Sequence, residues 1–514
     1  MNEPRDARAP SVLVDLRNCY EGYAGIPQEL RLLFKMFSEM RIGPLAGLAS
    51  GIHYLAPSFE KPRSPYERLM QQTQVLISQD TARFDVPTGI GVLPGRLRRM
   101  VTYPAVMLRT LGRSETLDME IDLPVFEDYI WSKLFDKTLA PRDRAFIHRA
   151  RFFATRLGHE NARHMAFLPR FLQKRIKTET WDVFFAASVS PYRVSPNTGM
   201  MVRYYDALPL TSPHTIGDPW SHALSHGRML QRNMLDGAHF YCDSEPVRED
   251  LLRLFPEAEK RVSTIPALLA SEFHPEICGM GTLNYILRKR ASAASKNAKS
   301  WVPAAGRPPR KLARAATWTR PGDMDASVRL FMAVSTMEPR KNYLKLFQGF
   351  ELACRMSDTP MRLLVVANPG WRSEAEVTEA RALVREGLVY HVSGVPISEL
   401  RRLYSMAHAV VCPSRAEGFD YSGVEGMACG APVLASDLPV HRWVYGTAAE
   451  YFDAYDVEEL AGMIVRFAEL PRDEGHLGGL RENGFRQAAL YRPEALSPKW
   501  EAAIQDAARR PRMA

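Results

Sequence analysis

Two adjacent cations, Arg340 and Lys341, stand in the stretch Glu338-Pro339-Arg340-Lys341-Asn342. The stretch follows an apolar run at 329–336 with the pattern of a strand, and it precedes a run at 343–356 with helical spacing of apolar residues. Two cations at the end of a strand, backed by the positive end of a helix, suit a diphosphate group. An isolated Arg-Lys pair is more often merely solvated, and here its position between strand and helix favours binding.

A second candidate segment runs from 417 to 430 and reads EGFDYSGVEGMACG. Glu417 lies in a loop after an apolar strand, and Glu425 lies eight positions later in a short helix. Because a carboxylate accepts two hydrogen bonds at once, one of them suits the hydroxyls of a sugar and the other a ribose diol. The glycines of the segment would let backbone N–H groups approach a phosphate. We expect this segment to bind a sugar joined to a nucleotide diphosphate, the sugar donor. The donor site would be lined by Gly418, Phe419, Asp420, Tyr421, Ser422 and Glu425.

A weaker signal is the stretch Val392-Ser393-Gly394-Val395, where another apolar run ends. Backbone groups of Gly394 and Val395 are expected to face the edge of a nucleobase there. Many strands end in glycine, so this stretch carries little weight without the two segments above.

The elements that position these residues follow from hydrophobic periodicity in the C-terminal half. Strands are predicted at 329–336, 362–368, 389–394, 408–414 and 431–436, and helices at 343–356, 373–386, 397–407 and 422–429. Such alternation predicts a parallel sheet covered on both faces. Ligands of such sheets bind at the carboxyl ends of the strands, where the candidate segments fall.

The N-terminal half repeats the pattern less clearly. It begins with a strand at 11–17, a loop containing Gly22 and Gly25, and a helix starting near Ile26-Pro27. Further strands are predicted at 181–187, 200–205, 238–244 and 261–266, and helices at 217–235 and 245–255. The stretch 62–173 resembles an insertion with no assignable task, and a helix at 498–509 is expected to pack back across the hinge.

Bulk properties are those of an ordinary globular protein of two domains. The chain is 46% hydrophobic and 24% charged, which is a typical balance for a globular protein. Its 514 residues exceed the length that one hydrophobic core usually serves. The sequence shows neither a membrane-spanning run nor an apolar leader segment. Its six cysteines are dispersed without a C-x-x-C pair, which favours reduced thiols and a cytoplasmic location.

The net charge of +9 comes from one segment. Ten of the 67 basic residues and no acidic residue lie between 288 and 320, which leaves 57 basic against 58 acidic residues elsewhere. This location does not favour nucleic-acid binding. We expect the segment to be a mobile linker that also contacts an anionic membrane surface and holds the protein peripherally at the inner face of the membrane.

The expected division of the chain is therefore fourfold. It comprises a first Rossmann-like domain at 1–278, a basic linker at 279–325, a second Rossmann-like domain at 326–485 and a helical tail at 486–514. The resemblance described next implies that the first domain is the acceptor side and that the second binds the nucleotide sugar.

The order of the EPRKN, EGF-x5-E and MACGAPV motifs resembles the retaining family 4 glycosyltransferases of the GT-B fold. The resemblance covers 328–467 well. In the first half it is looser and rests on the loop from Gly22 to Ile26 and on the stretch Tyr205-Asp206-Ala207-Leu208-Pro209. It implies an α/β fold with two Rossmann-like doubly wound domains facing across a cleft.

The resemblance also implies a metal-independent sugar transfer with retention at the anomeric carbon, without a cofactor beyond the nucleotide-sugar substrate. Arg340 and Lys341 would hold the diphosphate, Glu417 would contact the donor sugar, and Glu425 the ribose. Gly25 would lie on the donor side, and Tyr205 and Asp206 on the acceptor or donor side. Relatives with an EPRKN motif favour GDP-mannose as donor. The implied acceptor is a glycan or a lipid-linked sugar, in polysaccharide or lipopolysaccharide assembly.

Two departures from the family pattern keep alternatives open. Asp420-Tyr421-Ser422 replaces the usual glycine, hydrophobic residue and proline, and Tyr205 replaces a usual histidine. A catalytically impaired nucleotide-sugar-binding subunit is one alternative, and a GT-B nucleotide-sugar epimerase is another. No metal site is expected, because His159 and His164 have the wrong spacing for a zinc motif and His222 with His226 lacks a third ligand.

Overall fold

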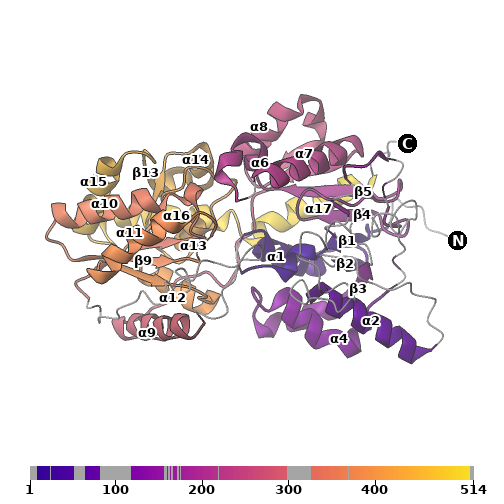
Figure 1. Ribbon diagram of the computed structural model, residues 1–514, viewed down its shortest axis with the longest axis horizontal. Coiled ribbons are helices and arrows are strands. Elements are labelled where there is room, and N and C mark those ends of the chain that lie inside the picture. Colours follow the sequence, from indigo (N-terminus) through magenta and orange to yellow (C-terminus); the bar gives the residue numbers. More distant parts are fainter. Residues whose placement is uncertain are drawn as a thin grey trace, which may run out of the picture.

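The computed structural model describes residues 8–23, 25–50, 64–80, 117, 119–155, 159, 162–163, 166–170, 173, 175–217, 219–297, 324, 326–368 and 370–509. These residues form two α/β domains that lie side by side, the first on the right of Figure 1 and the second on the left. Each domain is built on one parallel sheet, which confirms the expected pair of doubly wound domains.

The first sheet has seven strands within the described residues, in the order β3-β2-β1-β4-β5-β6-β7. The strands are β1 (Val12–Asp15), β2 (Leu45–Ser50), β3 (Ala150–Thr155), β4 (Val183–Ala186), β5 (Gly199–Tyr204), β6 (His239–Cys242) and β7 (Val262–Thr264). In the central strand, Val12 and Val14 pack into one hydrophobic cluster and Leu13 into another. Both faces of the sheet are therefore covered, as continuous apolar strands require.

Sequence reasoning missed β2 and β3. The short run of β2 is rich in alanine and glycine, which are weak strand formers. The strand β3 lies inside the stretch that resembled an insertion, yet it pairs in parallel with β2 from Leu45–Ala150 to Ser50–Thr155. The described part of that stretch is therefore an integral edge of the first domain.

Helices cover the first sheet. They are α1 (Ile26–Glu39), α2 (Pro65–Asp80), α4 (Leu123–Ile130), α6 (Leu208–Thr211), α7 (Pro219–Leu235) and α8 (Glu245–Leu254). The helix α1 begins with a proline at its first turn, where the missing N–H costs no hydrogen bond, as the sequence predicts.

The second sheet has six strands within the described residues, in the order β10-β9-β8-β11-β12-β13. They are β8 (Arg329–Val334), β9 (Met361–Val366), β10 (Val389–Val392), β11 (Ala409–Cys412), β12 (Val433–Ser436) and β13 (Ala449–Phe452). The chain order reverses between β8 and β11, the neighbouring strands at the centre. Such a switch point is where ligands of doubly wound sheets bind.

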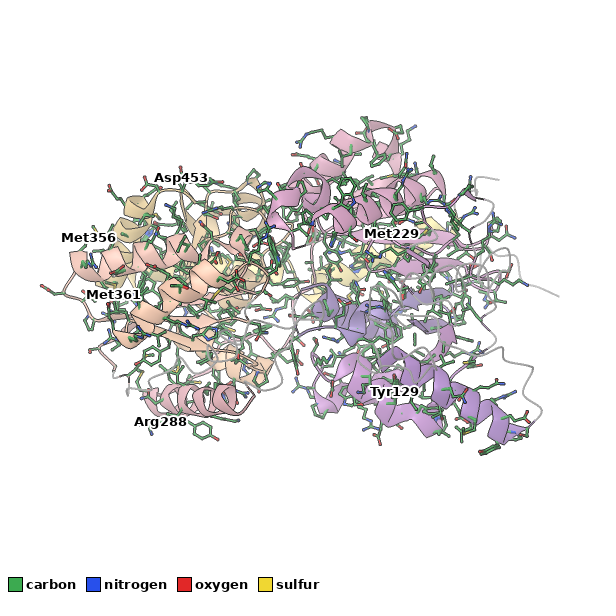
Figure 2. All side chains as sticks on the ribbon, in the orientation of Figure 1. Tyr129, Met229, Arg288, Met356, Met361 and Asp453 are labelled. Atoms are coloured by element: carbon green, nitrogen blue, oxygen red, sulfur yellow. The ribbon has the colours of Figure 1, made fainter. Side chains whose placement is uncertain are left out.

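The first four helices of the second domain follow the predicted ranges closely, and the last three lie where the sequence predicted no helix. In chain order, the helices of this domain are α10 (Tyr343–Met356), α11 (Glu374–Arg385), α12 (Ile397–Met406), α13 (Tyr421–Ala428), α14 (Pro439–Tyr445), α15 (Val457–Glu469) and α16 (Gly475–Ala489). Their apolar faces enclose the sheet on both sides, because Phe331 and Leu330 of β8 pack into different clusters. In Figure 2 the labels Met356, Met361 and Asp453 mark this domain, and Tyr129 and Met229 mark the first.

The segment expected to be an irregular linker contains a helix, α9 (Met280–Asn297). It lies along the second domain beside α12 in Figure 1, and Figure 2 labels Arg288 on it. Lys289 pairs with Glu399 of α12 at 2.8 Å, Arg290 pairs with the same carboxylate, and Arg290 also donates to the Gly394 carbonyl at 2.9 Å. Charge pairing with Glu399 therefore fixes this part of the basic segment, and residues 298–323 lie outside the described residues.

The last helix, α17 (Pro493–Arg509), returns from the second domain to the first (Figure 1). The fully buried Trp500 packs its ring 5.5 Å from Phe185, 5.8 Å from Phe37 and 5.5 Å from Tyr241. The Ala507 carbonyl leaves no space for a side chain at Gly199 of β5. The expected packing of the 498–509 helix across the hinge is thus confirmed.

Among the described residues, no helix has the length and apolar character needed to cross a membrane.

Candidate active site between the two domains

The turn that carries the two cations is fixed by Asn342. Residues Pro339–Lys341 form a short helical turn, η9, directly after β8, and Asn342 ends it in the left-handed region at φ 58°. Asparagine tolerates this conformation better than most residues. Its buried Nδ2 donates to the Pro413 carbonyl at 3.0 Å and to the Ala454 carbonyl at 2.7 Å. No role was assigned to Asn342 from the sequence, and the structure shows that it holds the turn against the end of β11.

The structure brings together the three residues predicted to be catalytic. Arg340 Nη1 lies 2.7 Å from Glu417 Oε2, and Lys341 Nζ pairs with Glu417 Oε1. The Ser414 hydroxyl donates to the same Oε1 at 2.6 Å. Seventy-six residues separate Lys341 from Glu417 in the chain, and the neighbouring positions of β8 and β11 in the sheet close that distance.

Burial and neighbouring charges have opposite effects on the ionisation of the side chains in this cluster. Burial raises the pKa of Glu417, but the charges of Lys341 and Arg340 outweigh it and hold the pKa below its usual range. Burial likewise disfavours the charged form of Arg340, and the carboxylates of Glu417 and Glu338 raise its pKa above the ordinary value. Glu417 and Arg340 are therefore ionised near neutral pH. An entering diphosphate would share the two cations with the carboxylates.

Glu425 is buried at the domain boundary and accepts hydrogen bonds from both domains. Tyr404 of α12 donates its hydroxyl to Oε2 at 3.1 Å, and Gln28 of α1 donates its amide to Oε1 at 3.1 Å. Burial raises the pKa of Glu425 to about 7, although both hydrogen bonds act to lower it. The predicted ribose ligand is thus a carboxyl group that changes charge near neutral pH.

Asp420 pairs with groups of α13 and α14. It caps α13 by accepting from the backbone N of Ser422 at 3.1 Å and from the Ser422 hydroxyl at 2.7 Å, and its other oxygen lies 3.4 Å from His441 Nε2. Burial opposes its ionisation, but the hydrogen bond to His441 and the charge of Lys341 hold the pKa well below its usual range. The side chains of Asp420 and Ser422, which are predicted to line the donor site, take part in the cap of α13.

Gly418 lies where the two domains touch. A Cβ at this position would lie 1.7 Å from the Tyr205 carbonyl oxygen and 3.3 Å from Asp206 Cβ, so only glycine fits. Ser244 of the first domain donates its hydroxyl to the Gly418 carbonyl at 2.8 Å. Tyr205 and Asp206, predicted on the first-domain side, therefore meet the loop that carries Glu417.

Asp206 faces the cationic cluster across this contact. Its carboxylate accepts from the Leu208 N–H at 3.0 Å. Burial raises its pKa above the ordinary value, while the charge of Arg340 acts in the opposite direction.

The remaining predicted donor-side residues have mainly structural contacts. Gly25 starts α1 at φ 70° and Gly394 follows β10 at φ 63°, and both have open space where a side chain would be. Val395 packs against the core, and Phe419 lies between the rings of Tyr421 and Tyr491 at 5.2 and 5.3 Å. Open space at the two glycines is compatible with a ligand approaching the backbone.

Arg31 is a supporting residue that the sequence did not indicate. Its buried guanidinium donates to the carbonyls of Cys19, Glu21 and Gly22 at 2.7, 2.7 and 2.9 Å. Burial lowers its pKa from the ordinary value. The loop that precedes Gly25 is therefore held from beneath by one side chain of α1.

His222 and His226 stack at 6.3 Å within α7, and the Tyr204 hydroxyl lies 3.4 Å from His226 Nε2. Burial lowers the pKa of His226 to about 4, so this imidazole is neutral near pH 7. Of the residues that the structure describes, none form a group of three or more side chains suited to a metal ion.

Comparison with known proteins finds similarity in the second domain. Residues 328–469 match the family described as Glycosyl transferases group 1. Over 170 residues the chain is 32% identical to O-antigen chain mannosyltransferase B of Escherichia coli, which covers 33% of this chain and 42% of that protein. Over 134 residues it is 32% identical to the MMP alpha-(1->4)-mannosyltransferase of Mycolicibacterium hassiacum, and the aligned part is 26% of this chain and 31% of that protein. The chain thus spans less than half the length of either relative.

Solved structures match nearly the whole chain at low identity. The sucrose-phosphate synthase of Thermosynechococcus elongatus has a TM-score of 0.53 at 15% identity and covers 97% of this chain and 99% of its own. HepE of Anabaena, solved in complex with UDP, has a TM-score of 0.50 at 11% identity, and the match covers 97% of this chain and 100% of HepE. These likenesses establish the GT-B fold for the chain. The match to the group 1 glycosyl transferases lies in the second domain, where the motifs predicted it.

Proposed function

We propose that this protein is a retaining glycosyltransferase that moves a hexose, with mannose favoured, from a nucleotide diphosphate to a glycan or lipid-linked acceptor. The observation that carries the proposal is the cluster of Arg340, Lys341 and Glu417 at the switch point of the second sheet. The first domain closes over this cluster through the contact of Tyr205 with Gly418.

The chemistry needs positive charge where the leaving group gains negative charge. When the bond between the anomeric carbon and the diphosphate breaks, the electron pair stays on the diphosphate oxygen. Arg340 and Lys341 are placed to stabilise that charge, which is the largest contribution in many such reactions. The acceptor oxygen then bonds to the anomeric carbon, and its proton leaves with the diphosphate or to solvent. Glu417 would orient the sugar, and Glu425 the ribose.

Three further points of the proposal rest on resemblance and on the relatives. Retention at the anomeric carbon follows from the family 4 pattern of the motifs. GDP-mannose as donor and a role in surface polysaccharide assembly are supported by relatives named as O-antigen chain and other mannosyltransferases. Peripheral contact with an anionic membrane from the cytoplasmic side is supported only by the basic composition of 288–320.

A donor panel tests the proposal. Purified protein is incubated with GDP-mannose, GDP-fucose, and UDP- and dTDP-sugars in the presence of a membrane extract, and released nucleoside diphosphate is measured. We expect turnover with one nucleotide class, lost in Glu417→Ala and Lys341→Ala. Glu482→Ala, which removes an exposed carboxylate on α16, is the matched control and retains turnover.

If no donor in the panel releases nucleoside diphosphate but GDP binds measurably, the impaired-subunit alternative is favoured. Conversion of the donor to a different nucleotide sugar, without transfer, would favour the epimerase.

A further inference from the structure

Three polar atoms at the contact between the domains are buried without a hydrogen-bond partner. They are Oδ1 of Asp243, just after β6, and the hydroxyls of Tyr205, just after β5, and of Tyr421, the first residue of α13. The Tyr205 hydroxyl faces Glu29 but does not meet the geometry of a hydrogen bond to it. Asp243 is only 2% exposed. Buried polar atoms in proteins are nearly always paired, so three in one place indicate a site for a ligand.

The three groups belong to one cluster although they come from separate segments and from both domains. Tyr421 of the second domain lies within electrostatic reach of Tyr205 and Asp243 of the first. The adjoining loop is fixed at the same boundary, because Gly418 packs on the Tyr205 carbonyl and its own carbonyl accepts from Ser244. The cluster therefore lies beside the loop that carries Glu417.

A buried ion pair packs against this cluster. Arg203 of β5 donates to Glu29 of α1 at 2.6 Å, and both side chains are completely buried. The guanidinium also donates to the Ile265 carbonyl at 2.5 Å and lies between the rings of Tyr205 and Trp500, 5.5 and 5.4 Å from their centres. Because Arg203 is already satisfied, it is not available to neutralise an added anion.

The chemistry of the cluster matches hydroxyl groups. A tyrosine hydroxyl both donates and accepts, and burial raises the pKa of Asp243 well above its usual range, so that its neutral acid also does both. Sugar hydroxyls have the same double capacity to donate and to accept. A phosphate would only accept, and it would add negative charge beside Glu29 and Asp206.

We propose that Tyr205, Tyr421 and Asp243 bind an uncharged sugar ring of the acceptor and disfavour a phosphorylated one. This inference rests on the proposed function, since it assigns the acceptor side of the same reaction. The departure from the family pattern at Tyr421 is thereby given a task, namely to present a hydroxyl from the second domain to a sugar held by the first.

The test measures sugar and nucleotide binding separately in the full-length protein. Saturation-transfer NMR compares methyl α-mannopyranoside with mannose 6-phosphate at millimolar concentration, with and without GDP, and calorimetry measures GDP affinity. We expect the uncharged glycoside to bind about tenfold more tightly than the phosphate ester. Tyr421→Phe and Asp243→Leu should each weaken glycoside binding about five- to tenfold, because each leaves a sugar hydroxyl without its partner. Asp243→Asn, which keeps a donor and an acceptor, should restore it.

Two controls separate this inference from the proposed function. Tyr285→Phe removes a hydroxyl from an exposed tyrosine of α9 and should change nothing. GDP affinity should be the same in the Asp243 variants and in Tyr285→Phe, because neither changed group belongs to the cationic cluster or to the expected donor site.

Tighter binding of the phosphate ester, or glycoside affinity unchanged in both loss variants, overturns the inference and leaves the proposed function intact. A bound water that satisfies all three groups, with unchanged glycoside affinity, does the same. Failure of the wild-type protein to bind any nucleoside diphosphate overturns the proposed function instead, whatever the glycoside result.

Discussion

The amide of Gln28 in the first domain donates a hydrogen bond at 3.1 Å to the Glu425 carboxylate in the second. This bond joins α1, which follows the Gly25 loop, to the residue expected to hold the ribose. Because burial raises the pKa of Glu425 to about 7, the strength of any contact it makes depends on pH in the physiological range.

We expect nucleotide affinity to rise with pH through about 7. Below this pH Glu425 is protonated and has lost acceptor capacity for a ribose diol, and above it the carboxylate accepts from both hydroxyls. Calorimetry with GDP between pH 6 and pH 8 measures the effect. Glu425→Gln is the matched control, because the terminal phosphate of the nucleotide itself titrates near about pH 6. An equal pH dependence in wild type and Glu425→Gln would contradict the assignment.

The pairing of Glu417 with Arg340 and Lys341 predicts opposite effects on binding and turnover. Glu417→Gln removes the carboxylate that neutralises both cations and should therefore increase GDP affinity, by about three- to tenfold. Turnover of the nucleotide sugar should fall by about 100-fold or more, because the residue that orients the sugar has changed. Calorimetry and initial rates measure the two effects. Loss of GDP affinity in this variant would show that the pairs exist only to hold the loop.

Gly418 offers a test of the contact between the domains. Gly418→Ala places a methyl group 1.7 Å from the Tyr205 carbonyl oxygen, so one backbone must move away. We expect transfer to fall by about 100-fold while GDP binding by the second domain stays within about threefold. Small-angle scattering should report a larger radius of gyration. Gly462→Ala, at a helix position with open space, is the control and should be neutral or slightly stabilising. Unchanged transfer in Gly418→Ala would exclude this closed contact from catalysis.

Asp420 predicts a dependence of stability on pH. Its folded-state pKa lies below its unfolded value, so its contribution to the free energy of unfolding is present above about pH 4 and is lost as pH falls further. Asp420→Asn keeps the helix cap and removes the charge beside His441. Urea denaturation should show a loss of about 2 kcal/mol at pH 7 that shrinks toward pH 3. Asp128→Asn, which breaks an exposed pair with Arg144, should cost less than about 1 kcal/mol.

The tail helix should be essential for the stability of the first domain. Trp500→Ala removes a fully buried ring from the contacts with Phe37, Phe185 and Arg203, and we expect a loss of about 3–5 kcal/mol in the free energy of unfolding. Trp220→Ala changes a tryptophan that is 78% exposed and should cost less than about 0.5 kcal/mol. Equal stability of the two variants, measured by denaturant unfolding, would show that α17 is not part of the first core.

The sequence by itself determined the central part of the second domain. Its strands are continuous apolar runs and its first four helices have clear apolar faces, so local patterns located the elements from β8 to α13 and the strand β12, but missed β13 and the helices α14, α15 and α16. The rule that ligands gather at the carboxyl ends of parallel strands then placed Arg340, Lys341 and Glu417 together before any distance was known. These inferences succeed because they depend on local periodicity and on one general property of parallel sheets.

Only the tertiary structure decided the partners of the buried polar groups. Gln28 and Glu425 are 397 residues apart, and Arg203 and Glu29 are 174 apart, so no local pattern relates them. The orientation of Asp420 depends on His441, a residue of another helix, and the task of Asn342 depends on two carbonyls from distant loops. Such contacts arise from how whole elements and domains pack, which is set by the summed burial of many side chains rather than by any short stretch of sequence.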